Sequence, residues 1–126
     1  MDCEIKGMDV FAFSISKAPL SVKELIDHFK INAKNIDYLF LHQANKYMLE
    51  KIRKKLDFPP EKVPYSLKDF GNTSCASIPL TMVSQCREVL QSTRKRNIAS
   101  AFGVGLSWGS LYFVTDHIVC SELIDY

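Results

Sequence analysis

Three short segments of this 126-residue chain combine residue types suited to stabilising a developing negative charge. The first, His42-Gln43-Ala44-Asn45, follows an apolar run and precedes a pattern typical of a helix. A histidine at a helix N-terminus meets free N–H groups and the positive end of the helix dipole. These keep its imidazole neutral and able to donate from one nitrogen. Capping of the turn is the competing interpretation of the same residues.

The other two segments are 70–77 (FGNTSCAS) and 102–109 (FGVGLSWG). In the first of them, the side-chain amide of Asn72 could donate to a carbonyl, although an Asx turn or a helix cap would also explain it. The second holds three of the five glycines of the chain. A strand follows these glycines, so they do not fit a phosphate-binding loop, which needs a helix there. Their backbone N–H groups could face an oxyanion, or the segment could be a hairpin without chemistry.

These segments must be positioned by an alternation of strands and helices. The pattern predicts strands at 8–15, 36–41, 62–67, 98–102 and 107–115, with 118–120 extending the sheet, and helices at 21–29, 44–56 and 78–90. The order β-α-β-α-β-α-β-β is typical of an α/β fold in which helices cover both faces of a mixed sheet. The last two strands are joined too closely for a crossover helix, so they form an antiparallel pair. Each of the three segments then lies at a strand end, where open α/β sheets place their sites.

Length, charge and hydropathy narrow the classes of protein. The length predicts a single domain, 1–126. Sixteen Lys and Arg against fourteen Asp and Glu give a net charge of +2, which excludes a strongly basic nucleic-acid-binding protein. No apolar run approaches the roughly 20 residues of a membrane span. The N-terminus has no signal-peptide pattern, and we expect a cytoplasmic protein.

The four cysteines, at positions 3, 75, 86 and 120, form no CxxC motif. Their spacing relative to the three histidines matches no zinc pattern, so we expect no metal site. Cys86 lies in an apolar helical stripe and Cys75 in a run of small residues. Both are interpreted as buried thiols in a reducing compartment.

HQAN at 42–45, GNTSCASIP at 71–79 and FGVGLSWG at 102–109 resemble the C-terminal half of β-ketoacyl-acyl-carrier-protein synthase III. This condensing enzyme starts fatty-acid synthesis and belongs to the thiolase-like superfamily. The order and spacing of the motifs match, and the resemblance extends from about residue 8 to about residue 113. It implies a thiolase-like C-terminal half for the whole chain.

The resemblance also implies a Cys-His-Asn site, in which His42 and Asn72 form the catalytic pair of this half. The backbone N–H of Val104 would face the oxyanion, because it lies where the family has its glycine-rich turn. Asn45 and Gln43 would contact the substrate, Asn45 through the pantetheine arm, and Lys46 would help to dock the acidic carrier protein. Acyl-CoA and a malonyl-carrier protein would be the substrates, with no further cofactor.

The nucleophilic cysteine of the family belongs to an N-terminal half that is absent from this sequence. None of the four cysteines has its context, so we expect the isolated chain to be inactive in condensation. The full-length protein would be a homodimer, and the isolated chain would expose an apolar patch and self-associate. Two alternatives stay open: a specialised acyltransferase of secondary metabolism, and a non-catalytic fragment that binds a partner.

Overall fold

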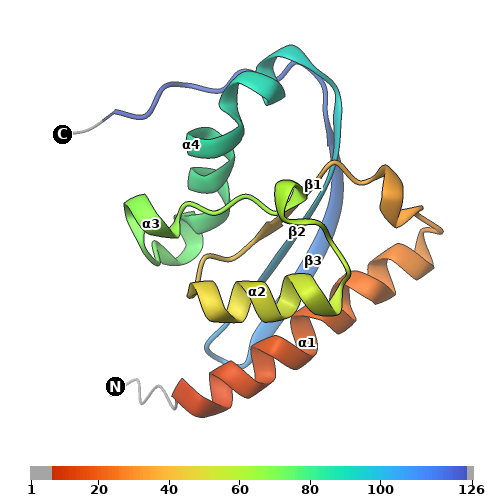
Figure 1. Cartoon of the computed structure of the whole chain (residues 1–126), viewed down its shortest axis with the longest axis vertical. Coiled ribbons are helices and arrows are strands. Elements are labelled where there is room, and N and C mark those ends of the chain that lie inside the picture. Colours follow the sequence, from red (N-terminus) through yellow and green to blue (C-terminus); the bar gives the residue numbers. More distant parts are fainter. Residues whose placement is uncertain (1–6, 125–126) are drawn as a thin grey trace.

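The computed structural model describes residues 7–124 of the chain. Its main elements are α1 (Gly7–His28), β1 (Tyr38–Leu41), α2 (Lys46–Lys55), α4 (Ser77–Ser92), β2 (Lys95–Gly103) and β3 (Ser107–Thr115). Short helical turns connect them: η1 (Ala33–Asn35), η2 (Pro60–Lys62), α3 (Leu67–Phe70) and η3 (Ser74–Ala76). Figure 1 shows the sheet between α4 on one side and α1 with α2 on the other.

The sheet has the strand order β1-β2-β3. β1 pairs with β2 in parallel, with Leu39 opposite Ile98, and β2 pairs with β3 antiparallel, with Phe102 opposite Trp108. The predicted antiparallel pair at the end of the chain is therefore confirmed. The predicted strand at 36–41 and the helices at 44–56 and 78–90 are also present, with ends shifted by a few residues.

Two hydrophobic cores lie on the two faces of the sheet, which confirms an α/β fold with helices on both faces. Val22 of α1 and Leu49 of α2 pack in the first core together with Leu39 of β1. Phe40 packs in the second core against Leu90 of α4. Because successive strand residues point to opposite faces, a strand buried on both sides must be apolar throughout, as 38–41 is.

The strand predicted at 8–15 is wrong, because these residues belong to the 22-residue helix α1. Ser14, Ala18 and Val22 are buried and lie four residues apart, which is the period of a helix face. Pro19 lies inside this helix and has no N–H for the carbonyl of Ile15. Nζ of Lys55 in α2 donates to that carbonyl at 2.8 Å, so a second helix satisfies the group that proline leaves free.

The expected helix start at Ser21 is therefore also wrong. Ser21 lies in the middle of α1, and its hydroxyl donates to Oγ of Ser110 in β3 at 2.9 Å instead of capping a helix. Ser110 in turn donates to Ser100 of β2 at 2.9 Å. The three hydroxyls of Ser21, Ser110 and Ser100 therefore link α1 to β3 and β2 by hydrogen bonds.

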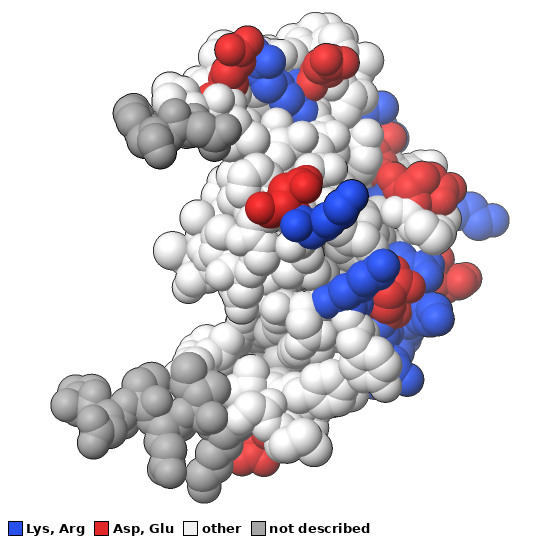
Figure 2. Space-filling model, turned by 60° about the vertical axis from the view of Figure 1, so that its left-hand side comes forward, with Lys and Arg blue, Asp and Glu red and all other residues white. Residues whose placement is uncertain are grey.

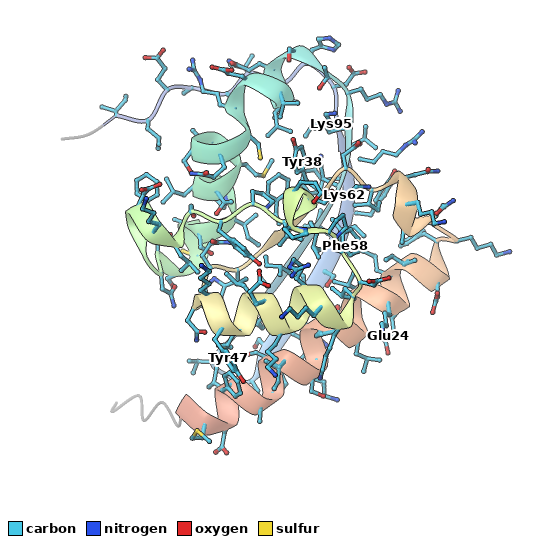
Figure 3. All side chains as sticks on the ribbon, in the orientation of Figure 1. Glu24, Tyr38, Tyr47, Phe58, Lys62 and Lys95 are labelled. Carbon is cyan, nitrogen blue, oxygen red and sulfur yellow. The ribbon has the colours of Figure 1, made fainter. Side chains whose placement is uncertain are left out.

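The strand predicted at 62–67 is not formed. Pro64 cannot donate to a ladder, and the segment is held along β1 by side chains instead. Nζ of Lys62 donates to the carbonyls of Ile36 at 2.6 Å and Lys34 at 3.0 Å, and Figure 3 labels this lysine. The extension predicted at 118–120 is absent as well, because the N–H of Ile118 donates to the carbonyl of Leu90 in α4.

Acid is expected to weaken the attachment between α2 and the segment that follows it. Oε1 of Glu50 accepts from the Tyr65 hydroxyl at 2.6 Å, and Oε2 accepts from Arg53 at 2.8 Å. The bonds from Arg53 and then Tyr65 lower the pKa of Glu50 from its ordinary value of 4.5 to about 2. A depressed folded-state pKa contributes stability that is complete above the unfolded value and is lost as pH falls toward the folded value.

We therefore expect the free energy of unfolding to fall between about pH 5 and pH 2 by on the order of 1 kcal/mol through this group, which is partly exposed. Denaturant titrations at several pH values measure this slope. Glu50→Gln should flatten it, whereas Glu88→Gln, an exposed position on α4, should leave it as in the wild type. An unchanged slope in Glu50→Gln would show that this carboxylate is not responsible.

Candidate active site

His42 follows the carboxyl end of β1 and is half-buried. Its Nδ1 lies 2.7 Å from Oγ of Ser77, the first residue of α4. Its ring packs edge-on against the ring of Phe102, with the two ring centroids 5.4 Å apart. Burial lowers the pKa of His42, and a hydrogen bond to the backbone of Ser74 opposes this effect more weakly. The imidazole is therefore neutral at neutral pH and can donate from one nitrogen.

Asn72 lies in the exposed turn before α4. Gly71 has φ +65°, a conformation that favours glycine, and it brings the chain sharply into this turn. Oδ1 of Asn72 accepts from the N–H of Ser74 at 2.9 Å, so the Asx turn considered for this residue is present. This turn uses only the acceptor of the side chain, so the Nδ2 hydrogens are not engaged by it. The two interpretations of Asn72 are therefore compatible.

A cavity of about 880 Å³ joins the three segments singled out in the sequence. His42 and Asn45 line it from the end of β1 and the start of α2, Asn72 from the loop before α4, and Val104 from the turn between β2 and β3. Asn45 also caps α2, because its Oδ1 accepts from the N–H of Met48 at 2.9 Å.

The N-terminal end of α1 also lines this cavity, through Gly7, Met8, Val10 and Phe11. None of these residues is among the site residues expected from the sequence, because residues 8–15 have the composition of a strand. The helical spacing of the buried positions in α1 is the signal that would have found them.

Gln43, expected to contact the substrate, is fully buried and does not face the cavity. Its Nε2 donates to the carbonyl of Leu41 at 2.8 Å, and its Oε1 accepts from the N–H of Ser66 at 3.0 Å. Both ends of the amide are therefore occupied by backbone, and we correct its role to one of supporting the loop. Lys46 is exposed at the first turn of α2, outside the cavity lining, and its contact with a carrier protein stays a prediction.

The expectation that Cys75 is buried is also wrong, because it is exposed and lines the cavity. Cys86 and Cys120 are buried in the second core, and all three thiols are free. Cys3 lies outside the described residues. Burial, with a smaller contribution from Cys120, raises the pKa of Cys86 to about 11.

A thiol reagent should therefore distinguish Cys75 from Cys86. We expect Cys75 to be alkylated by iodoacetamide at least about tenfold faster, since the thiolate is the reactive form and a buried thiol of raised pKa supplies little of it. Peptide mapping by mass spectrometry measures each site separately. Equal rates in the folded chain would contradict this placement, and equal rates in denaturant serve as the control.

Within residues 7–124, no group of three or more His, Cys, Asp or Glu side chains is placed to hold a metal ion. None of the helices described in this range is long and apolar enough to cross a membrane.

The family model described as 3-oxoacyl-(acyl-carrier-protein (ACP)) synthase III C terminal matches residues 26–114. The chain belongs to this family. The beta-ketoacyl-(acyl-carrier-protein) synthase III of Trichodesmium erythraeum is 39% identical over 109 residues, and that of Streptococcus sanguinis is 42% identical over 110 residues. These alignments cover 86% and 83% of this chain and 33% of each relative.

The crystal structure of a 3-oxoacyl-(acyl-carrier protein) synthase from Burkholderia xenovorans superposes with a TM-score of 0.87 at 32% identity. It covers 90% of this chain and 33% of that one. The thiolase-like C-terminal fold expected from the motifs is therefore confirmed. The chain spans about a third of the length of the synthase III relatives that it matches.

Proposed function

We propose that this chain is the C-terminal part of a 3-oxoacyl-acyl-carrier-protein synthase III and supplies His42 and Asn72 for decarboxylative condensation. The observation that carries the proposal is the shared cavity, which a neutral imidazole and an unengaged amide donor both line. Acyl-CoA and a malonyl-carrier protein are the proposed substrates, in fatty-acid synthesis, and the proposal requires no further cofactor.

The two side chains would donate hydrogen bonds to the thioester carbonyl of the malonyl group. When CO₂ leaves, the electron pair of the broken carbon–carbon bond stays with the α-carbon and is shared with the thioester oxygen as an enolate. The two donors stabilise the negative charge on that oxygen. The α-carbon then attacks the carbonyl of an acyl-cysteine thioester supplied by the N-terminal half. The thiolate leaves as the new carbon–carbon bond is completed. The N–H of Val104 would stabilise the tetrahedral oxyanion.

We infer that an N-terminal half covers the face formed by the N-terminal part of α4 together with β2, β3 and the turn between them. No charged residue occurs in segments 70–86 and 97–115, and Figure 2 shows a broad, hollowed face with few charged side chains. The second of these segments exposes Val104, Leu106, Trp108 and Leu111, each to about half its surface. Such a surface is typical of an interface.

In the isolated chain, this face should drive the self-association expected from the sequence. Analytical ultracentrifugation over a range of concentrations measures it. Leu111→Lys, at a side chain that is 53% exposed on β3, should shift the chain toward monomer. Val119→Lys, at a residue 93% exposed outside these segments, is the matched control and should not. A wild-type monomer at high concentration would contradict the expectation.

A chimera tests the proposed function directly. Residues 7–115 would replace the matched C-terminal part of the Streptococcus sanguinis synthase, which keeps its own N-terminal half. We expect the chimera to form ketoacyl-carrier protein from acyl-CoA and malonyl-carrier protein. A folded but inactive chimera would contradict the proposal. The 126-residue chain alone should take up no acyl group from acyl-CoA, and a covalent acyl-cysteine in its mass spectrum would show that it has its own nucleophile.

A further inference from the structure

We propose that the Ser77 hydroxyl is a positioning group that holds His42 as the neutral tautomer with its proton on Nε2. Ser77 is 1% exposed, and its Oγ lies 2.7 Å from Nδ1 of His42. The same oxygen accepts from the N–H of Gln43 at 3.3 Å. The inference concerns the chain itself, and only its catalytic meaning rests on the proposed function.

The direction of the His42–Ser77 bond follows from counting hydrogens. If Nδ1 carried a proton, Oγ of Ser77 would accept from both Nδ1 and Gln43, and its own hydrogen would need a further acceptor in a buried place. Such an unsatisfied donor costs about 1–3 kcal/mol. If Nδ1 is unprotonated, the hydroxyl donates to it and every group is satisfied. The neutral ring then carries its proton on Nε2.

A buried hydrogen-bond network keeps Ser77 in this place. Thr81, one turn further along α4, donates from Oγ1 to the carbonyl of Ser77 at 2.7 Å. Because its one hydroxyl hydrogen is used there, the Ser66 hydroxyl donates to Thr81 Oγ1, at 2.7 Å. The N–H of Ser66 donates to Gln43, which returns the network to the loop that carries His42. Ser77 and its three supporting residues are at most 1% exposed.

The consequence concerns the nitrogen that a ligand would meet. Ser77 occupies Nδ1 and His42 lines the cavity, so a ligand there would bond Nε2, in competition with the backbone of Ser74 that also bonds this ring. With its proton on Nε2, His42 can donate a hydrogen bond to the carbonyl oxygen of a ligand. In the other tautomer, Nε2 would carry a lone pair, which repels that oxygen. Protonation of Nδ1 would also leave the hydroxyl hydrogen of Ser77 without a hydrogen-bond acceptor, and this cost favours the neutral ring.

Long-range ¹H–¹⁵N correlation NMR on the ¹⁵N-labelled chain distinguishes the two tautomers, with His42→Ala assigning the signals among the three histidines. At a pH where the ring is neutral, we expect a single dominant form with Nδ1 unprotonated. Ser77→Ala should change this into a mixture of both forms. Ser66→Ala removes an equally buried hydroxyl from the same network without touching His42, and it should lower stability but keep the wild-type tautomer.

A wild-type spectrum with the proton on Nδ1 would overturn the proposal, and so would an unchanged tautomer in folded Ser77→Ala. If Ser77→Ala does not fold, the wild-type spectrum decides the question alone. The measurement uses no substrate, so it separates this inference from the proposed function. An inactive chimera together with an Nε2–H tautomer would reject the function and leave the positioning role supported.

Discussion

Replacing His42 with alanine in the chimeric synthase is expected to slow decarboxylation of malonyl-carrier protein by about 10²- to 10³-fold, the usual effect of removing one preorganised donor to an oxyanion. The reason is that charge develops on the thioester oxygen only as CO₂ leaves, so a donor aimed at that oxygen stabilises the transition state more than the bound substrate. Release of ¹⁴CO₂ from labelled malonyl-carrier protein measures this step without the condensation.

The matched control is His28→Ala, at an exposed histidine at the end of α1 whose ring contacts Phe29. This variant should release CO₂ at the rate of the unmodified chimera. Acylation of the cysteine by acyl-CoA, which precedes decarboxylation, should continue in His42→Ala. Decarboxylation at an unchanged rate in His42→Ala would remove this residue from the mechanism.

Replacing Gln43 with leucine is expected to lower the free energy of unfolding by about 2–4 kcal/mol. The side chain is of similar size, but it leaves the N–H of Ser66 and the carbonyl of Leu41 without their partners in a fully buried place. Each buried unsatisfied group costs about 1–3 kcal/mol. Denaturant unfolding followed by circular dichroism measures the change.

Gln85→Leu makes the same replacement at an exposed position of α4, where the amide contacts only Ser84, and it should change stability by less than about 0.5 kcal/mol. This comparison also decides between the two roles considered for Gln43. A substrate contact predicts a stable Gln43→Leu variant with weakened ligand binding. Full wild-type stability would therefore contradict the supporting role that we assign.

The amino-acid sequence by itself determined the fold class and the antiparallel pairing of the last two strands. A strand with helices on both faces must be apolar throughout, so the apolar run before His42 predicts such a strand. The structure confirms it, because both faces of β1 are buried in the two cores. The short glycine-rich connection at 102–109 predicts an antiparallel hairpin because no crossover fits in its length. The motifs also located His42, Asn72 and Val104, which line one cavity.

Short-range patterns failed where distant groups satisfy the backbone. Residues 8–15 have the composition of a strand, and Pro19 argues against a helix through them. α1 continues because Lys55, forty positions away, bonds the carbonyl of Ile15 that proline leaves free. The segment at 62–67 is apolar enough for a strand, yet the Lys62 side chain occupies the carbonyls of Lys34 and Ile36 beside β1.

Only the tertiary structure decided which polar residues of the HQAN motif face the cavity. In sequence, His42 and Gln43 are adjacent and equally suited to a ligand. In the fold, the N–H of Ser66 and the hydroxyl of Ser77 come from segments 23 and 34 residues away from Gln43, and they bind Gln43 and His42 on their buried sides. A buried hydrogen-bond donor must find an acceptor. No local sequence pattern shows where these donors lie. Their positions decide that Gln43 supports the loop and that His42 lines the cavity.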